Sequence, residues 1–270
     1  MFKNYSLING LYENGIIEKL PKFLIRKIRK SFNIHFIPTS KKFLSEQNYP
    51  MVHSYVAQNE LFNHFKLKKK QTSFNTCQYL IPLLSLIFEK NDNFNFLDVG
   101  GENIDFYLEL KEKFPLVKYF VFNQKIILDN FKKVKTLNNL KDFNLVYDID
   151  DLSDNDFDFI NLGSVIQYIK EYEKLLLKLI SVSSKYIFVS GTHLFDYSKK
   201  KENNIIVKQV NLLPHISFLY FICKEYFYKI FFDNSYKIVF ETKNYTSNTN
   251  YKNFKKIIED IQYTDVLFKK

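Results

Sequence analysis

Short apolar runs alternate with stretches of helical spacing through the middle of the chain. Five apolar runs predict buried strands, over Asn95–Val99, Lys118–Phe122, Leu145–Tyr147, Phe157–Leu162 and Lys185–Ser190. Between the runs, helical spacing of apolar residues predicts helices over Asp105–Phe114, Lys125–Phe131 and Glu171–Ser181. This alternation predicts an α/β fold, in which helices cover both faces of a mostly parallel sheet.

The flanking segments extend this pattern. Thr76–Glu89 predicts a mostly buried helix with a kink at Pro82. After Gly191 a longer excursion runs to Asn234 and contains an apolar run and a predicted helix, at Leu212–Cys223 and Glu225–Phe232. The last segments predict a sixth strand, a helix and a short final strand, over Tyr236–Glu241, Tyr251–Ile261 and Asp265–Phe268. We therefore expect one α/β domain over residues 73–270, with an insertion at about 191–234.

The first 72 residues lack strand-like periodicity, are expected to form a mainly helical extension, and carry most of the net positive charge of the chain. Eight basic residues and no acidic one lie between Lys19 and Lys42, and Lys66, Lys68, Lys69 and Lys70 add four more. Subtracting these twelve charges from the net charge of +10 leaves the rest of the chain at −2. This distribution does not favour nucleic-acid binding by the main domain. A basic helix over Lys19–Phe32 could lie on an anionic membrane surface or pack on the main domain.

The use of cysteine fits a reducing compartment, and the hydropathy of the chain predicts no membrane-spanning helix. Cys77 and Cys223 lie far apart and lack metal-ligand spacing, so we expect buried thiols and neither a metal site nor a disulfide framework. The longest apolar run has 12 residues, whereas a membrane-spanning helix needs about 20. With no visible signal peptide, we expect a cytoplasmic protein, with peripheral membrane contact through residues 19–42 as an alternative.

The strongest candidate motif is Phe96-Leu97-Asp98-Val99-Gly100-Gly101-Glu102, where an apolar strand runs into two glycines and a helix. Ligands of open α/β sheets bind beyond the carboxyl ends of the strands, and glycines there let the backbone approach a ligand closely. Asp98 and Glu102 could accept hydrogen bonds from a cationic or hydroxyl-bearing ligand. A tight structural turn would explain the two glycines equally well. The motif matches neither the dinucleotide fingerprint G-x-G-x-x-G nor a P-loop.

Polar residues follow the next strands at comparable positions. Asp148, Asp150 and Asp151 follow the third strand, and Asn161–Ser164 ends the fourth. Because parallel strands present their carboxyl ends at one edge of the sheet, these residues and the glycine turn would line one site. The alternative is that the acidic loop is simply a solvated turn.

The order LDVGG, KYFVFN, acidic loop, FDFINLGSVIQYI and KYIFVSGT resembles class I S-adenosylmethionine-dependent methyltransferases. It is similar in particular to a family of methyltransferases often found in bacterial surface-polysaccharide gene clusters, with Val165–Tyr168 matching a characteristic stretch after the fourth strand. The resemblance covers roughly residues 75–268. It implies a Rossmann-like fold with a mostly parallel seven-stranded sheet, and S-adenosylmethionine as cofactor. The cofactor contacts that it implies are Asp98, Gly100, Gly101, Glu102, Asn123, Asp148, Asn161 and Gly163.

Two positions depart from that resemblance. Class I enzymes usually have Asp or Glu at the end of the second strand to hold the ribose hydroxyls, and here Asn123 stands there. An amide can bind hydroxyls, but without the strength of a charged acceptor. The glycine motif is also one glycine short. Both departures leave open a non-catalytic relative that keeps the fold as a binding or scaffold module.

Methyl transfer requires mainly that the acceptor be aligned with the methyl group, with a base where it must lose a proton. The candidate catalytic residues are His193, expected just past the fifth strand, and Tyr168; His215 is a weaker third. Each could instead be structural: a surface histidine, or a tyrosine that packs at the start of a helix. The insertion is where such enzymes commonly bind the acceptor, which we expect to be a small molecule or glycan precursor.

Overall fold

The computed structural model describes residues 79–244 and 251–270, except 103, 155, 183–184, 199–200, 210–216, 252–253 and 255–256. It also describes residues 21, 23–24, 27 and 35–38. The predicted basic helix at Lys19–Phe32 therefore lies almost entirely outside the described residues, and Cys77 and His215 lie outside them too. Within the described part, no helix is both long enough and apolar enough to cross a membrane.

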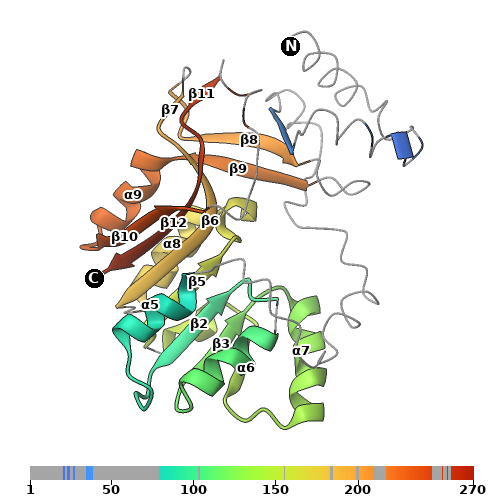
Figure 1. Cartoon of the computed structure of the whole chain (residues 1–270), viewed down its shortest axis with the longest axis vertical. Coiled ribbons are helices and arrows are strands. Elements are labelled where there is room, and N and C mark those ends of the chain that lie inside the picture. The colour runs from blue at the N-terminus through green and yellow to red at the C-terminus, as the bar shows by residue number, and fades with distance from the viewer. Residues whose placement is uncertain are drawn as a thin grey trace.

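Seven strands form the central part of the sheet, in the order β4-β3-β2-β5-β6-β12-β10 (Figure 1). Their bounds are β2 Asn95–Val99, β3 Lys118–Phe122, β4 Phe143–Val146, β5 Phe159–Gly163, β6 Tyr186–Phe195, β10 Lys237–Lys243 and β12 Gln262–Lys269. The first five strands in this order are mutually parallel, and β12 is antiparallel to both of its neighbours, β6 and β10. The predicted mostly parallel seven-stranded sheet is thus confirmed.

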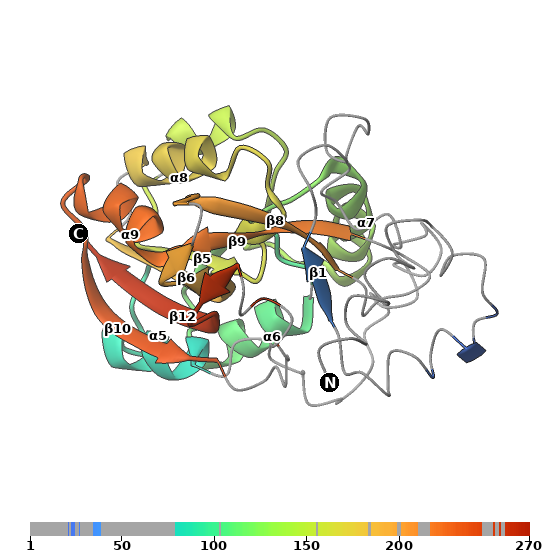
Figure 2. The ribbon, with the colours of Figure 1, turned by 90° about the horizontal axis from the view of Figure 1, so that it is seen from above.

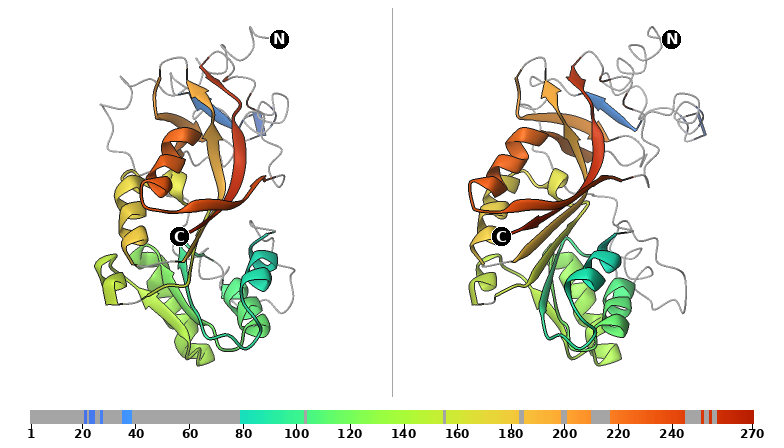
Figure 3. Two further views of the ribbon diagram at one scale, coloured as in Figure 1. Left: turned by 90° about the vertical axis from the view of Figure 1, so that its left-hand side faces the viewer. Right: turned by 60° about the vertical axis from the view of Figure 1, so that its left-hand side comes forward.

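Helices cover both faces of this sheet, as predicted (Figure 3). On one face lie α5 (Leu80–Ile87), α6 (Ile104–Lys113) and α7 (Lys125–Asn138). On the other lie α8 (Tyr172–Ser181) and α9 (Lys224–Phe232). Because successive side chains of a strand point to opposite faces, Phe96 and Asp98 share the face of α6, while Leu97 and Val99 pack with α8.

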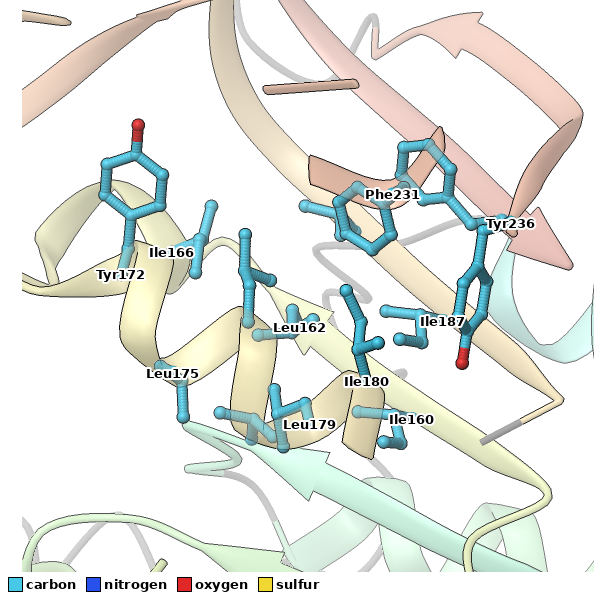
Figure 4. Close-up of a cluster of buried hydrophobic side chains, with 14 of the residues drawn as sticks. Ile160, Leu162, Ile166, Tyr172, Leu175, Leu179, Ile180, Ile187, Phe231 and Tyr236 are labelled. Carbon is cyan, nitrogen blue, oxygen red and sulfur yellow. The ribbon is translucent and has the colours of Figure 1, made fainter. Parts of the chain in front are cut away.

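The two faces bury different side chains. The face under α5, α6 and α7 is rich in rings, and those of Phe96, Tyr119 and Phe143 stack along neighbouring strands. The strands buried under α8 and α9 present more aliphatic side chains, such as Leu162 of β5 and Ile187 of β6. They pack with Leu179 of α8 and Phe231 of α9 (Figure 4). Burial of such side chains from water is the main favourable contribution to folding.

Three further strands widen the sheet beyond β6, so that ten strands are joined in total. β6 continues through Gly191 to Phe195, and its end pairs in parallel with β9 (Ser217–Cys223). β8 (Asn204–Gln209) is antiparallel to β9, and β1 (Phe36–Pro38) is antiparallel to β8 (Figure 2). The insertion predicted at 191–234 therefore builds strands, which the sequence pattern did not predict, and the N-terminal region supplies the outermost one.

Three local expectations were wrong. Pro82 lies in the first turn of α5, where its missing N–H would have no partner within the helix, so it needs no kink. Tyr251–Ile261 is not one helix, because Ile258–Glu259 forms strand β11, which pairs with β7 (Tyr197–Ser198). Cys223 is partly exposed rather than buried.

Candidate functional site

The glycine turn after β2 is shaped by contacts that only glycine allows. Gly100 has a φ of +78°, and a β-carbon there would lie 2.5 Å from Cγ2 of Val165. Its N–H donates to the carbonyl oxygen of Phe122 at 2.8 Å, which fixes the turn to the end of β3. A β-carbon on Gly101 would overlap Oδ2 of Asp98. The turn therefore brings bare backbone next to a carboxylate, at the carboxyl end of the sheet, while Glu102 points to the surface.

Asp98 is a buried carboxylate held by two neutral donors. It is 5% exposed and pairs in register with Asn161 on β5. The Tyr119 hydroxyl donates to Oδ2 at 2.5 Å, and Asn161 Nδ2 donates to Oδ1 at 2.8 Å. Burial raises the pKa of Asp98, and these two hydrogen bonds oppose that rise.

Two buried polar side-chain atoms at the carboxyl ends of the central strands have no hydrogen-bond partner among the described residues. They are Oδ1 of Asn161 and Oγ of Ser190, which lie on the neighbouring strands β5 and β6. Gly163 is in register with Ser190, and a β-carbon there would lie 3.4 Å from Asn161 Nδ2 and 3.9 Å from Ser190 Oγ. An unsatisfied buried polar atom costs about 1–3 kcal/mol. Asn161 Oδ1 can only accept, and the Ser190 hydroxyl can accept or donate, so this group of polar atoms suits a ligand that donates hydrogen bonds.

The two other predicted cofactor positions serve the local backbone. Asn123 follows β3 as expected, but its Nδ2 donates to the Gly101 carbonyl at 2.9 Å and its Oδ1 accepts from the Gln124 N–H at 2.7 Å. The amide thus ties the glycine turn to β3. Asp148 follows β4 and is exposed; its Oδ1 accepts the Asp150 N–H at 3.0 Å, at the start of the 3-10 helix η2 (Asp150–Asp154).

The turn after β5 is strained and fixed from several sides. Ser164 has a φ of +54°, which is uncommon for a residue other than glycine. Its N–H donates to the Ser190 carbonyl, its carbonyl accepts from Gln167 Nε2, and its hydroxyl lies 2.8 Å from that of Tyr263 on β12. Gln167 Nε2 also donates to the Gly191 carbonyl at 3.0 Å. The turn is therefore clamped to β6 and β12, directly beside Val165 and the glycine turn.

The predicted catalytic residue His193 lies within β6, not past it, because that strand is longer than its apolar run indicated. It is 4% exposed, and the rings of Phe36, Phe221 and Tyr263 have centroids 4.7, 4.9 and 4.7 Å from its own. Its Nδ1 lies 2.8 Å from the Tyr251 hydroxyl. Burial, helped by the charge of His35, lowers the pKa of His193 to about 3. The imidazole is thus neutral near pH 7 and weakly basic.

Tyr168, the other candidate catalyst, lies in the short 3-10 helix η3 (Ile166–Tyr168). Its hydroxyl donates to Oε1 of Gln209 on β8 at 2.9 Å. Its ring packs against a cluster of buried hydrophobic side chains that contains Phe36 and Phe221. Tyr168 therefore joins the turn after β5 to the inserted strands, and these contacts favour the alternative that it packs at the start of a helix.

Several residues that shape the site were not found from the sequence. Tyr119 is one of several aromatic residues in an apolar strand, and only the register of β2 and β3 brings its hydroxyl to Asp98. Asp265 is fully buried; its Oδ1 accepts the Gly191 N–H at 2.7 Å and Nδ2 of Asn244 at 2.9 Å. Both roles depend on strand pairing between distant segments.

Comparison with known proteins supports the fold. No protein-family model matches the sequence, and no curated protein matches it significantly. The chain is similar to the N-terminal domain of EvdMO1, crystallised in the presence of SAH and D-fucose: identity is 14%, the TM-score is 0.51, and 78% of this chain and 93% of that one are covered. It is also similar to the Burkholderia thailandensis 1,6-didemethyltoxoflavin-N1-methyltransferase with bound 1,6-didemethyltoxoflavin and S-adenosylhomocysteine: identity is 9%, the TM-score is 0.50, and 87% of this chain and 94% of that one are covered. The chain thus has the same Rossmann-like fold as these two proteins.

Proposed function

We propose that this protein is an S-adenosylmethionine-dependent methyltransferase. The observation that carries the proposal is the set of buried polar groups at the carboxyl ends of β2, β5 and β6: Asp98, Asn161 Oδ1 and Ser190 Oγ. Two proteins with the same fold were crystallised with S-adenosylhomocysteine or in its presence, which supports the same class of cofactor here.

The residues fit the methionine end of that cofactor. Asp98 and Asn161 Oδ1 would accept hydrogen bonds from an ammonium group, and Gly100 and Gly101 would let the backbone come close to it. Asn123 would hold the turn in place, and the acidic loop at Asp148 would face the adenine. When bound, the cofactor supplies an electrophilic methyl group on a sulfonium.

The acceptor side of the site would be formed by the insertion. Ser164, Tyr263 and His193 join the turn after β5 to β12 and β6, and the inserted strands β8 and β9 follow. His193 is neutral and surrounded by rings, so these residues would suit an uncharged acceptor better than an anionic one. We propose a small molecule or a glycan precursor, in keeping with the resemblance to methyltransferases of polysaccharide gene clusters.

Calorimetric titration of the purified protein with S-adenosylmethionine and S-adenosylhomocysteine tests the cofactor, with NAD as the control. Saturable binding in the micromolar range, about −8 kcal/mol, is the expected result for the first two. A folded protein that binds neither would contradict the proposal.

A non-catalytic module with this fold is the second candidate. Asn123 favours it, because its amide is engaged by Gly101 and Gln124 and provides no carboxylate for ribose hydroxyls. Binding of the full chain to anionic liposomes through residues 19–42, without cofactor binding, would support this candidate over the enzyme.

A further inference from the structure

Asp98 is buried with no cation beside it among the described residues. Its two hydrogen-bond donors are neutral, and no charged group contributes to its pKa shift. Among the titratable groups nearby, Tyr119 of β3 contacts Asp98 and Tyr107 of α6 packs against Tyr119, while Asp105 lies in the first turn of α6 and Glu102 in the turn is exposed. α5 and β5 contain no titratable side chain. A buried carboxylate in such surroundings is stabilised by a cation that arrives with a ligand.

Tyr119 is placed to control this carboxylate. Its ring is 1% exposed and stacked between Phe96 and Phe143, at centroid distances of 5.6 and 5.3 Å, so the hydroxyl has one fixed position. Burial and the neighbouring Asp98 raise the pKa of Tyr119 well above its usual value, so the hydroxyl stays a protonated donor. A donor to a carboxylate stabilises its ionised form.

We propose that Tyr119 is a positioning residue that orients Asp98 toward the ammonium group of the cofactor and favours its ionised form, so that Asp98 gives up its proton when the cofactor binds. This inference rests on the proposed function. The sign follows from linkage: burial favours protonated Asp98 in the free protein, and a bound cation favours ionised Asp98. Affinity for an ammonium-bearing ligand should therefore rise with pH through the raised pKa of Asp98 and level off above it.

The test compares Tyr119→Phe with wild type by calorimetric titration with S-adenosylhomocysteine between pH 5.5 and 8.5. Titrations in two buffers of different ionisation enthalpy measure the protons released. Removing the hydroxyl should move the midpoint of the affinity profile upward by about one pH unit, which is about a tenfold loss of affinity on the acidic side. Tyr107→Phe is the matched control, because Tyr107 packs against Tyr119 in the same core and makes no hydrogen bond to Asp98.

A second ligand, which lacks the ammonium group, shows whether the pH dependence arises from contact of that group with Asp98. 5′-Methylthioadenosine keeps the nucleoside and the sulfur but lacks the ammonium group, so its affinity should be independent of pH and equal in wild type and Tyr119→Phe. If S-adenosylhomocysteine binds both proteins with one pH profile, the inference is overturned while the cofactor assignment stands. If the wild type binds neither ligand, the proposed function and the inference both fail. Should Tyr119→Phe not fold, the wild type still decides, because equal pH dependence and proton release for the two ligands would contradict the inference.

Discussion

Asp98 and His193 are both buried titratable residues, and their surroundings differ in kind. Asp98 contacts Asn161, whose Oδ1 has no partner among the described residues, and Ser190 Oγ on the next strand also has none there. His193 lies among aromatic rings, and its Nδ1 is paired with the Tyr251 hydroxyl. Buried polar atoms without partners are costly, and a bound ligand can satisfy them. A hydrogen-bonded imidazole packed among aromatic rings is, in contrast, typical of a protein core. From this comparison we expect cofactor binding to depend on Asp98, and we expect His193 to contribute to stability and not to cofactor binding.

The largest effect expected from this comparison is that of Asp98→Ala on cofactor binding. Removing the carboxylate takes away the one anionic acceptor among these polar groups, and we expect a loss of about 2–5 kcal/mol in binding free energy, at least about thirtyfold in Kd. Tyr119 and Asn161 also lose their acceptor, so stability should fall by about 1–3 kcal/mol. Calorimetric titration with S-adenosylhomocysteine measures the loss of affinity, and urea unfolding measures the loss of stability.

Asp233→Ala is the control for Asp98→Ala. Asp233 is a surface carboxylate at the end of α9, paired with Lys229 in an exposed i,i+4 ion pair, so both quantities should change by less than about 0.5 kcal/mol. Wild-type affinity in a folded Asp98→Ala protein would remove Asp98 from the site and reverse the comparison.

The second prediction concerns His193→Phe and the dependence of stability on pH. The pKa of His193 is about 3 when folded and near 6.5 when unfolded, so the unfolded chain takes up the proton first as the pH falls. His193 therefore lowers stability by about 1.4 kcal/mol per pH unit between about pH 6.5 and 3. Asp98 acts in the opposite sense, because its raised pKa adds stability as the pH falls through that raised pKa toward the value of an unfolded carboxyl group.

Urea unfolding at several pH values between 7 and 4 tests this difference. His193→Phe should unfold at lower urea at pH 7, because the hydrogen bond to Tyr251 is lost, and yet lose less stability than wild type on acidification. Its affinity for S-adenosylhomocysteine should stay within about twofold of wild type. A collapse of affinity in a folded His193→Phe protein would place the ring cluster in the binding site.

The central sheet could be predicted from the sequence because its information is local. β2 and β3 have the predicted bounds residue for residue, since each is a short run of apolar residues flanked by polar ones. The turn could be predicted because its backbone requires glycine: Gly100 has a positive φ that other residues rarely adopt, and the sequence shows this requirement as two glycines after a strand. Asp98 and Asn161 could be placed together because parallel strands end at one edge.

The inserted strands and the surroundings of His193 could not be predicted, because they depend on pairing between distant segments. Phe36 reaches His193 only because β1 pairs with β8, some 170 residues further along the chain. The segment at Tyr251–Ile261 has helical spacing of apolar residues, but pairing of β11 with β7 decides its structure at Ile258–Glu259. Tertiary pairing overrides local pattern in such segments. The hydrogen bond from Tyr119 to Asp98 could not be predicted either, because nothing in its run of strand-forming residues distinguishes Tyr119 from its neighbours.

The smallest expected effect separates packing from catalysis at Tyr168. Its hydroxyl donates to Gln209, and the hydroxyl of Tyr172 donates to Asn204 at 2.8 Å, so both tyrosines join the segment after β5 to β8. Tyr168→Phe and Tyr172→Phe should each cost about 0.5–1.5 kcal/mol of stability and leave S-adenosylhomocysteine affinity unchanged. Thermal unfolding and calorimetry measure both variants side by side. A Tyr168→Phe protein of wild-type stability that binds the cofactor but transfers no methyl group would instead make Tyr168 a catalyst, and would extend the functional site from Asp98 to the inserted strands.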